Sequence, residues 1–199
     1  MVTTRDGKLA DRMRTVRFHG VSKDAWSRYG RSASPRYEVI EPGWKYNMLD
    51  LQAALGVEQM RKLERFNGQR AELAARYAEG LADVDEVRPL DTVPYDHVHA
   101  WHLYVVRLDL ARLSIGRDAF MGELGKLGIG VGLHFTPVHL HRFYAEKYGY
   151  RAGDLPHSEA AGEAILSLPL YPLLTSKMQE RVVAAVKKVV AANGKPRAR

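Results

Sequence analysis

In residues 102–108, His-Leu-Tyr-Val-Val-Arg-Leu, aromatic and β-branched side chains follow one another with apolar groups on both faces of an extended chain. Such a run is typical of a buried strand. After it, helical and extended patterns alternate: a helix is predicted over residues 117–127 and a second strand over residues 129–135. The sequence therefore predicts an α/β domain from about residue 69 onward.

The last third of the chain continues the alternation. A helix is predicted to begin near Pro156, and an extended segment follows over residues 167–172. The final helix is predicted to begin at Ser176, because Ser176 and Gln179 have the spacing of a capping box. Its valines recur at helical spacing, which predicts a packed face.

The segment before residue 69 has a different character. A short strand is predicted over residues 1–4, a helix capped by Asp6, a long loop over residues 21–43, a helix capped by Asp50, and a break or bend at residues 67–68. These elements do not provide a self-contained core. The segment is therefore expected to belong to a larger domain.

Composition narrows the class of protein. The chain has 199 residues, of which 46% are hydrophobic, and no cysteine, so disulfides and thiolate metal sites are excluded. It shows no apolar targeting segment and no run long enough to span a membrane, so a cytoplasmic protein without membrane partners is expected. The net charge of +7 is interleaved with acidic residues, which favours a solvated basic surface over a nucleic-acid-binding stripe.

Two groups of residues are candidates for a site. The glycines of residues 128–132 enter a predicted strand instead of opening a helix, so they do not have the context of a phosphate-binding loop. His134, His139 and His141 are interpreted either as polar contacts to a hydroxyl-rich or phosphorylated ligand or as ordinary surface residues. No carboxylate at ligand spacing accompanies them, so no metal site is predicted.

Lys45 is the second candidate. It lies in residues 43–50, Gly-Trp-Lys-Tyr-Asn-Met-Leu-Asp, just before a predicted helix start. A cation beside a helix N-terminus suits an anion such as a phosphate. The alternative is an ordinary surface lysine in a loop, and the chemistry of the segment alone favours this alternative over a phosphate-binding residue.

Five ordered blocks resemble the DegT/DnrJ/StrS family of nucleotide-sugar aminotransferases. They are residues 19–29 (HGVSKDAWSRY), 43–54 (GWKYNMLDLQAA), 99–104 (HAWHLY), 128–139 (GIGVGLHFTPVH) and 166–172 (LSLPLYP). The order and spacing of the blocks make the resemblance far more specific than any one block does.

The resemblance implies a fold-type I enzyme that depends on pyridoxal 5'-phosphate and forms a homodimer. It implies that residues 67–199 are the small C-terminal α/β domain, and that residues 1–66 are a remnant of the large cofactor domain with an interface loop and a connecting helix. The implied reaction transfers an amino group, commonly from glutamate, to a nucleotide-linked keto-sugar in polysaccharide or deoxysugar biosynthesis.

The resemblance also assigns residues. Lys45 and Asn47 match positions that bind the cofactor across the dimer, although many members have asparagine and arginine there, and His134 and His139 match positions that line the sugar-nucleotide pocket. The family's Schiff-base lysine precedes the segment that matches residues 1–4, so no catalytic residue is assigned and the isolated chain is expected to be inactive. The alternative is a non-catalytic dimerisation or complementation module of the same fold.

Overall fold

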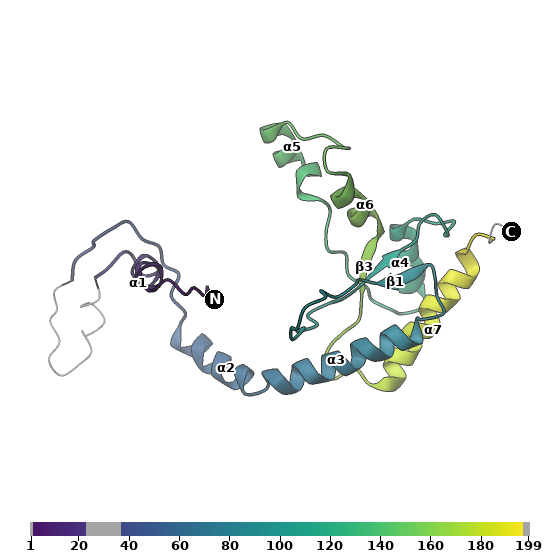
Figure 1. The fold of residues 1–199 in the computed structure, drawn as a ribbon, viewed down its shortest axis with the longest axis horizontal. Helices are drawn as coiled ribbons and strands as arrows, with labels where there is room; N and C mark the ends of the chain where they lie inside the picture. The colour runs from purple at the N-terminus through teal and green to yellow at the C-terminus, as the bar shows by residue number, and fades with distance from the viewer. Residues whose placement is uncertain (1, 23–36, 197–199) are drawn as a thin grey trace. The chain divides into compact units, whose positions relative to one another are not determined.

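The computed structural model describes residues 2–22 and 37–196, which fall into two compact units, Met1–Arg61 and Lys62–Arg199 (Figure 1). Residue 1 of the predicted N-terminal strand, most of the predicted loop over 21–43 and the larger part of block 19–29 lie outside the described residues. None of the described helices has both the length and the apolar character that crossing a membrane requires.

The Lys62–Arg199 unit is built on a three-stranded antiparallel sheet. Its strands are β1 (Val87–Pro89), β2 (Tyr104–Leu108) and β3 (Ile165–Leu168), in the order β1-β2-β3. The strand predicted over residues 102–108 is thus confirmed, as the central strand. Its side chains alternate, because Tyr104, Val106 and Leu108 are buried whereas Arg107 is exposed. Only one face of the sheet therefore carries the main core.

Helices supply the rest of that core. They are α3 (Leu63–Gly80), α4 (Arg117–Lys126), α5 (Arg142–Tyr148), α6 (Pro156–Ala164) and α7 (Ser176–Asn193), with a short 3-10 turn, η2 (Val138–Leu140). Helix α7 packs on α3 and α4, α4 also contacts β3, and α6 contacts β2 (Figure 1). Tyr77, Phe120, Leu124 and Val186 are completely buried in this core. The predicted helices in 117–127 and from Pro156 are confirmed.

Two polar contacts fasten α3 to the C-terminal part of the unit. The Tyr77 hydroxyl donates to the carbonyl of Pro169 at 2.9 Å, and Nε2 of the buried Gln179 donates to the carbonyl of Leu73 at 2.6 Å. The spacing of Ser176 and Gln179 predicted a capping box, and this prediction is wrong, because the Gln179 side chain binds the backbone of α3. Thr175 caps α7 instead, because its hydroxyl accepts from the backbone N–H of Met178 at 3.3 Å.

The prediction of a strand over residues 129–135 is wrong. Only Gly132 pairs, through two backbone hydrogen bonds of 3.0 and 2.8 Å with Ser167. The chain then leaves the sheet toward η2. The apolar residues of this run therefore do not form the repeated backbone hydrogen bonds of a strand pair. Short apolar runs do not distinguish these two outcomes by pattern alone.

No break occurs at residues 67–68, because α3 continues through Asn67 and Gly68. A helical glycine costs about 1 kcal/mol relative to alanine. Burial of Leu73 and Tyr77 further along the same helix outweighs that cost. The interruption lies earlier, at residues 61–62, where α2 ends.

The Met1–Arg61 unit contains α1 (Gly7–Val16) and α2 (Asp50–Met60). The predicted Asp6 cap is confirmed, since its carboxylate accepts from the backbone N–H groups of Lys8 and Leu9. Asp50 lies within the first turn of α2 and does not cap it; Leu49 holds the N-cap position. Residues 2–4 are not a strand, because no described segment pairs with them.

A close backbone crossing holds this unit together. Residues 16–20 run beside residues 43–46, with Trp44 N–H donating to the carbonyl of Val16 at 2.7 Å and His19 N–H donating to that of Trp44 at 2.9 Å. A Cβ added to Gly43 would lie 2.0 Å from the backbone nitrogen of Gly20. Only glycine permits this approach.

Candidate functional site

Lys45 lies on the crossing segment of the Met1–Arg61 unit. Its backbone pairs with Phe18, and its ammonium lies 4.3 Å from the centroid of the Phe18 ring. The side chain is exposed and forms no ion pair with any residue in 2–22 or 37–196. A cation–π contact at an exposed site contributes only about 0.5–1 kcal/mol. The ammonium therefore keeps the capacity to bind an anion.

Asn47 is half-buried on the same segment. Its amide nitrogen makes one long contact of 3.4 Å to the carbonyl of Met48, while its Oδ1 atom is buried without a hydrogen-bond partner. A buried carbonyl oxygen calls for a donor. This orientation of Asn47 suits a hydroxyl or an N–H group better than a phosphate oxygen.

His134 is held against the sheet in the other unit. Its Nε2 atom lies 2.7 Å from the hydroxyl of Ser167, on β3. The same hydroxyl lies 3.4 Å from the carbonyl of Gly132, so Ser167 links the imidazole of His134 to the backbone of residue 132. A Cβ on residue 132 would lie 2.5 Å from Nε2, so glycine is needed beside this pair.

His139 is placed differently. Its side chain is only 4% exposed, and its Nε2 atom lies 2.9 Å from Oε1 of Glu159. The carboxylate of Glu159 also accepts from the backbone N–H groups of Gly153, at 2.9 Å, and Leu155, at 3.2 Å. Glu159 thus joins η2, the turn before α6, and α6 itself.

These contacts change the acidity of Glu159. The hydrogen bond from His139, and after it the one from Gly153, hold the pKa of this carboxyl below its ordinary value. Sequence reasoning missed both Glu159 and Ser167. The only sequence feature that singles out Glu159 is its place in the first turn of α6. An acidic residue at that place indicates the start of a helix and does not indicate a hydrogen bond to a histidine.

A cavity of about 390 Å³ adjoins His139. Its wall consists of uncharged side chains and His139, with the ring of Tyr150 edge-on to the imidazole at 6.0 Å; the lining residues are Val138, His139, Tyr144, Tyr148, Tyr150, Leu155 and Ser158. Three tyrosines and one serine give it a few polar atoms on a largely apolar surface. Such a lining suits a ring with hydroxyl groups or a planar heterocycle.

The structure thus sorts the four predicted site residues into two local environments. Lys45 and Asn47 share one segment of the Met1–Arg61 unit. His134 and His139 share one segment of the Lys62–Arg199 unit but contact different partners, Ser167 and Glu159. Across the described ranges, no three histidine, aspartate or glutamate side chains converge in a way that could hold a metal ion.

The His139–Glu159 pair predicts a pH dependence of stability. Since the pKa of Glu159 is lower in the folded than in the unfolded chain, its contribution is complete above the unfolded value of about 4.3 and is lost as the pH falls further. We expect Glu159→Gln to lower the midpoint of thermal unfolding at pH 7, and the difference from wild type to shrink below pH 4. Calorimetry between pH 3 and 8 measures this; a difference that is constant with pH would contradict a contribution from the ionised Glu159 carboxylate.

Sequence and structure comparisons agree on the family. A model of the DegT/DnrJ/EryC1/StrS aminotransferase family matches residues 1–187. MJ1066, an uncharacterized protein of Methanocaldococcus jannaschii, is 43% identical over 194 residues, which cover 97% of this chain and 50% of that protein.

Among the solved structures that are similar to the chain are an aminotransferase and a putative sugar aminotransferase. The aminotransferase TlmJ from Streptoalloteichus hindustanus is 31% identical with a TM-score of 0.78, over 94% of this chain and 46% of TlmJ. The putative sugar aminotransferase Spr1654 from Streptococcus pneumoniae, in its PMP form, is 26% identical with a TM-score of 0.82, over 95% and 46%. The chain therefore spans about half the length of these relatives. It belongs to the DegT/DnrJ/EryC1/StrS aminotransferase family.

Proposed function

We propose that the chain forms the C-terminal part of a cytoplasmic pyridoxal-phosphate-dependent aminotransferase that transfers an amino group, commonly from glutamate, to a nucleotide-linked keto-sugar for polysaccharide or deoxysugar biosynthesis. The family match over residues 1–187 is the observation that carries this proposal. In it, residues 67–199 are the small α/β domain, and residues 1–66 are a remnant of the large cofactor domain.

The proposed cofactor site is shared between the subunits of a homodimer. Bound pyridoxal phosphate supplies the electron sink for moving an amino group, and the protein supplies binding and orientation. Lys45 fits the phosphate, because its ammonium is exposed and free of carboxylates among the described residues. Asn47 fits a donor group better, through its unpartnered Oδ1 atom.

The proposed substrate site uses the histidine segment. Nδ1 of His134 is open to a substrate hydroxyl, since Nε2 is engaged by Ser167. His139 has its Nε2 atom on Glu159, so in this proposal it forms the wall of the 390 Å³ cavity and orients the segment that carries His134. The uncharged lining of the cavity suits a sugar ring or a nucleobase.

The resemblance implies that the family's Schiff-base lysine precedes the segment matching residues 1–4, so in this proposal the 199 residues do not transaminate alone. A non-catalytic complementation module is the second candidate. Exposed apolar side chains on α2 favour it, because Leu51, Leu55, Val57 and Met60 are each 54–75% exposed. Apolar side chains exposed around a helix in this way call for a covering partner.

A chimera tests the proposal. The chain replaces the matching 194 residues of MJ1066, and the affinity for pyridoxal phosphate is measured by absorbance and fluorescence titration beside the parent protein. We expect the chimera to bind the cofactor. We expect Lys45→Ala to weaken binding about tenfold or more, because a charge-assisted contact contributes about 1.5–3 kcal/mol.

Lys126→Ala is the matched control, because Lys126 is an exposed lysine on α4. Its affinity for the cofactor should equal that of the unmodified chimera. A folded chimera that binds no cofactor would contradict the aminotransferase proposal and would favour the second candidate, the non-catalytic complementation module. Equal affinities for Lys45→Ala and Lys126→Ala would remove Lys45 from the phosphate site.

A further inference from the structure

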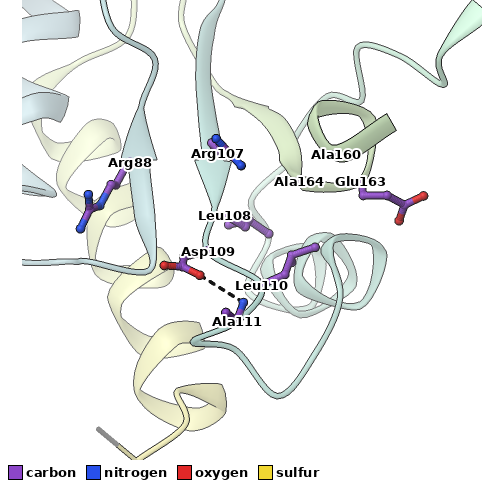
Figure 2. Close-up of a pocket in the computed structure, with 9 residues that line it drawn as sticks. All are labelled: Arg88, Arg107, Leu108, Asp109, Leu110, Ala111, Ala160, Glu163 and Ala164. Atoms are coloured by element: carbon purple, nitrogen blue, oxygen red, sulfur yellow. Dashed lines mark hydrogen bonds between the residues drawn. The ribbon is translucent and has the colours of Figure 1, made fainter. Parts of the chain in front are cut away.

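A second cavity, of about 520 Å³, lies beside β1, β2 and α6 (Figure 2). Strands β1 and β2 form one side of it and α6 the other. Its apolar part comes from Leu108, Leu110 and Ala111 near the end of β2 and from Ala160 and Ala164 of α6. The small side chains of α6 leave this space open beside the strand.

Two arginines border this cavity from adjacent strands. Arg88 of β1 and Arg107 of β2 are direct partners in the antiparallel register, so both side chains emerge on the same face. Like charges directly opposite one another destabilise a strand pair. The cost of this arrangement calls for a compensating negative charge.

The residues in 2–22 and 37–196 do not supply that charge to Arg107. The Arg107 side chain is exposed and forms no hydrogen bond or ion pair with any residue that the structure describes. Arg88 is held more loosely than by a close ion pair: its Nε atom donates to the carbonyl of Asp85 at 3.3 Å, its Nη2 atom lies 3.7 Å from Oδ1 of Asp85, and its side chain is 66% exposed. Both guanidinium groups therefore have donors to spare.

The acidic residues at the cavity do not compensate either. Asp109 is engaged elsewhere, because Oδ1 accepts from the backbone N–H of Ala111 at 3.1 Å and Oδ2 lies 3.3 Å from Nε of Arg112. Figure 2 shows the carboxylate of Glu163, on α6, directed away from β2. The wall formed by β1 and β2 is thus positively charged above an apolar space.

We propose that Arg107 and Arg88 bind the oxyanion of a small organic ligand, a carboxylate or a phosphate, whose apolar body occupies the 520 Å³ cavity. Guanidinium groups suit this role, because their planar donors match both oxyanions in a bidentate manner. The volume is within the range of small-molecule sites. All residues of this site belong to the Lys62–Arg199 unit, so the proposal does not depend on the aminotransferase function.

The test is a titration of the 199-residue chain, followed by NMR on the arginine Nε–H signals. The probes are phenyl phosphate, benzoate, inorganic phosphate and benzyl alcohol. We expect one of the two aromatic anions to shift the Arg107 signal and to bind more tightly than inorganic phosphate, which lacks the apolar body. Comparing phenyl phosphate with benzoate identifies the preferred oxyanion. Arg107→Gln should weaken that binding about tenfold.

Arg142→Gln provides the control, because Arg142 is an exposed arginine on α5 paired with Glu146. It should leave the affinity unchanged. Equal binding of benzyl alcohol would show an apolar cavity without an oxyanion site and would overturn the proposal. Failure of both aromatic anions to bind, or equal effects of the two arginine substitutions, would overturn it as well.

Discussion

Phe120→Ala is expected to lower the free energy of unfolding of the Lys62–Arg199 unit by about 3–5 kcal/mol. The Phe120 ring is completely buried on α4, beside the equally buried Leu124, in the core that α4 shares with α7 and β3. Its removal exchanges apolar contacts for a cavity that the surrounding helices fill only in part. Domains of this size have about 5–15 kcal/mol of stability in total, so much of it would be lost.

Urea denaturation followed by circular dichroism measures this loss. Lys126→Ala, at the exposed end of the same helix, is the control and should stay within about 0.5 kcal/mol of wild type. A loss below about 1 kcal/mol for Phe120→Ala would contradict the packing described for α4.

Gly43→Ala is expected to open the backbone crossing of the Met1–Arg61 unit. The new methyl group would lie 2.0 Å from the backbone nitrogen of Gly20 and 2.5 Å from the carbonyl carbon of His19. Both atoms are main-chain atoms, so the clash cannot be relieved by rotating a side chain. The cost falls in the large class of substitution effects, on the order of 4 kcal/mol or more.

Hydrogen exchange of the Trp44 and His19 amides measures this opening, since both donate across the crossing. We expect their protection to be lost in Gly43→Ala. Gly56→Ala in α2 is the matched control, because no atom lies within 4 Å of its added methyl group. It should retain protection and gain about 0.5–1 kcal/mol of helix stability. Unchanged protection in Gly43→Ala would contradict the crossing.

Helices were more predictable from this sequence than strands. The helices at 117–127 and from Ser176 have a full apolar period, and the structure contains both, as well as the helix predicted from Pro156. The run over 129–135 is apolar too, yet only Gly132 pairs with β3. Strand formation there depended on a partner far along the chain, which no local pattern contains.

The same limit applies to the site. Sequence blocks singled out His134 and His139, but their partners, Ser167 and Glu159, lie 33 and 20 residues away. The register that places Arg88 opposite Arg107 is likewise a property of the folded sheet. The residue types and the family-like sequence blocks indicated which side chains could bind a ligand. Contacts between distant parts of the folded chain determine which atoms of those side chains remain open to it.

The packing of α7 on α3 has a consequence for synthesis of the protein. Gln179 binds the carbonyl of Leu73 across 106 residues of sequence, and the buried face of α7 extends to Val189. On the ribosome, α3 emerges long before the helix that covers it. The apolar side of α3 is therefore unshielded until α7 has been synthesised, and any nascent chain that stops short of α7 presents that surface to chaperones and proteases.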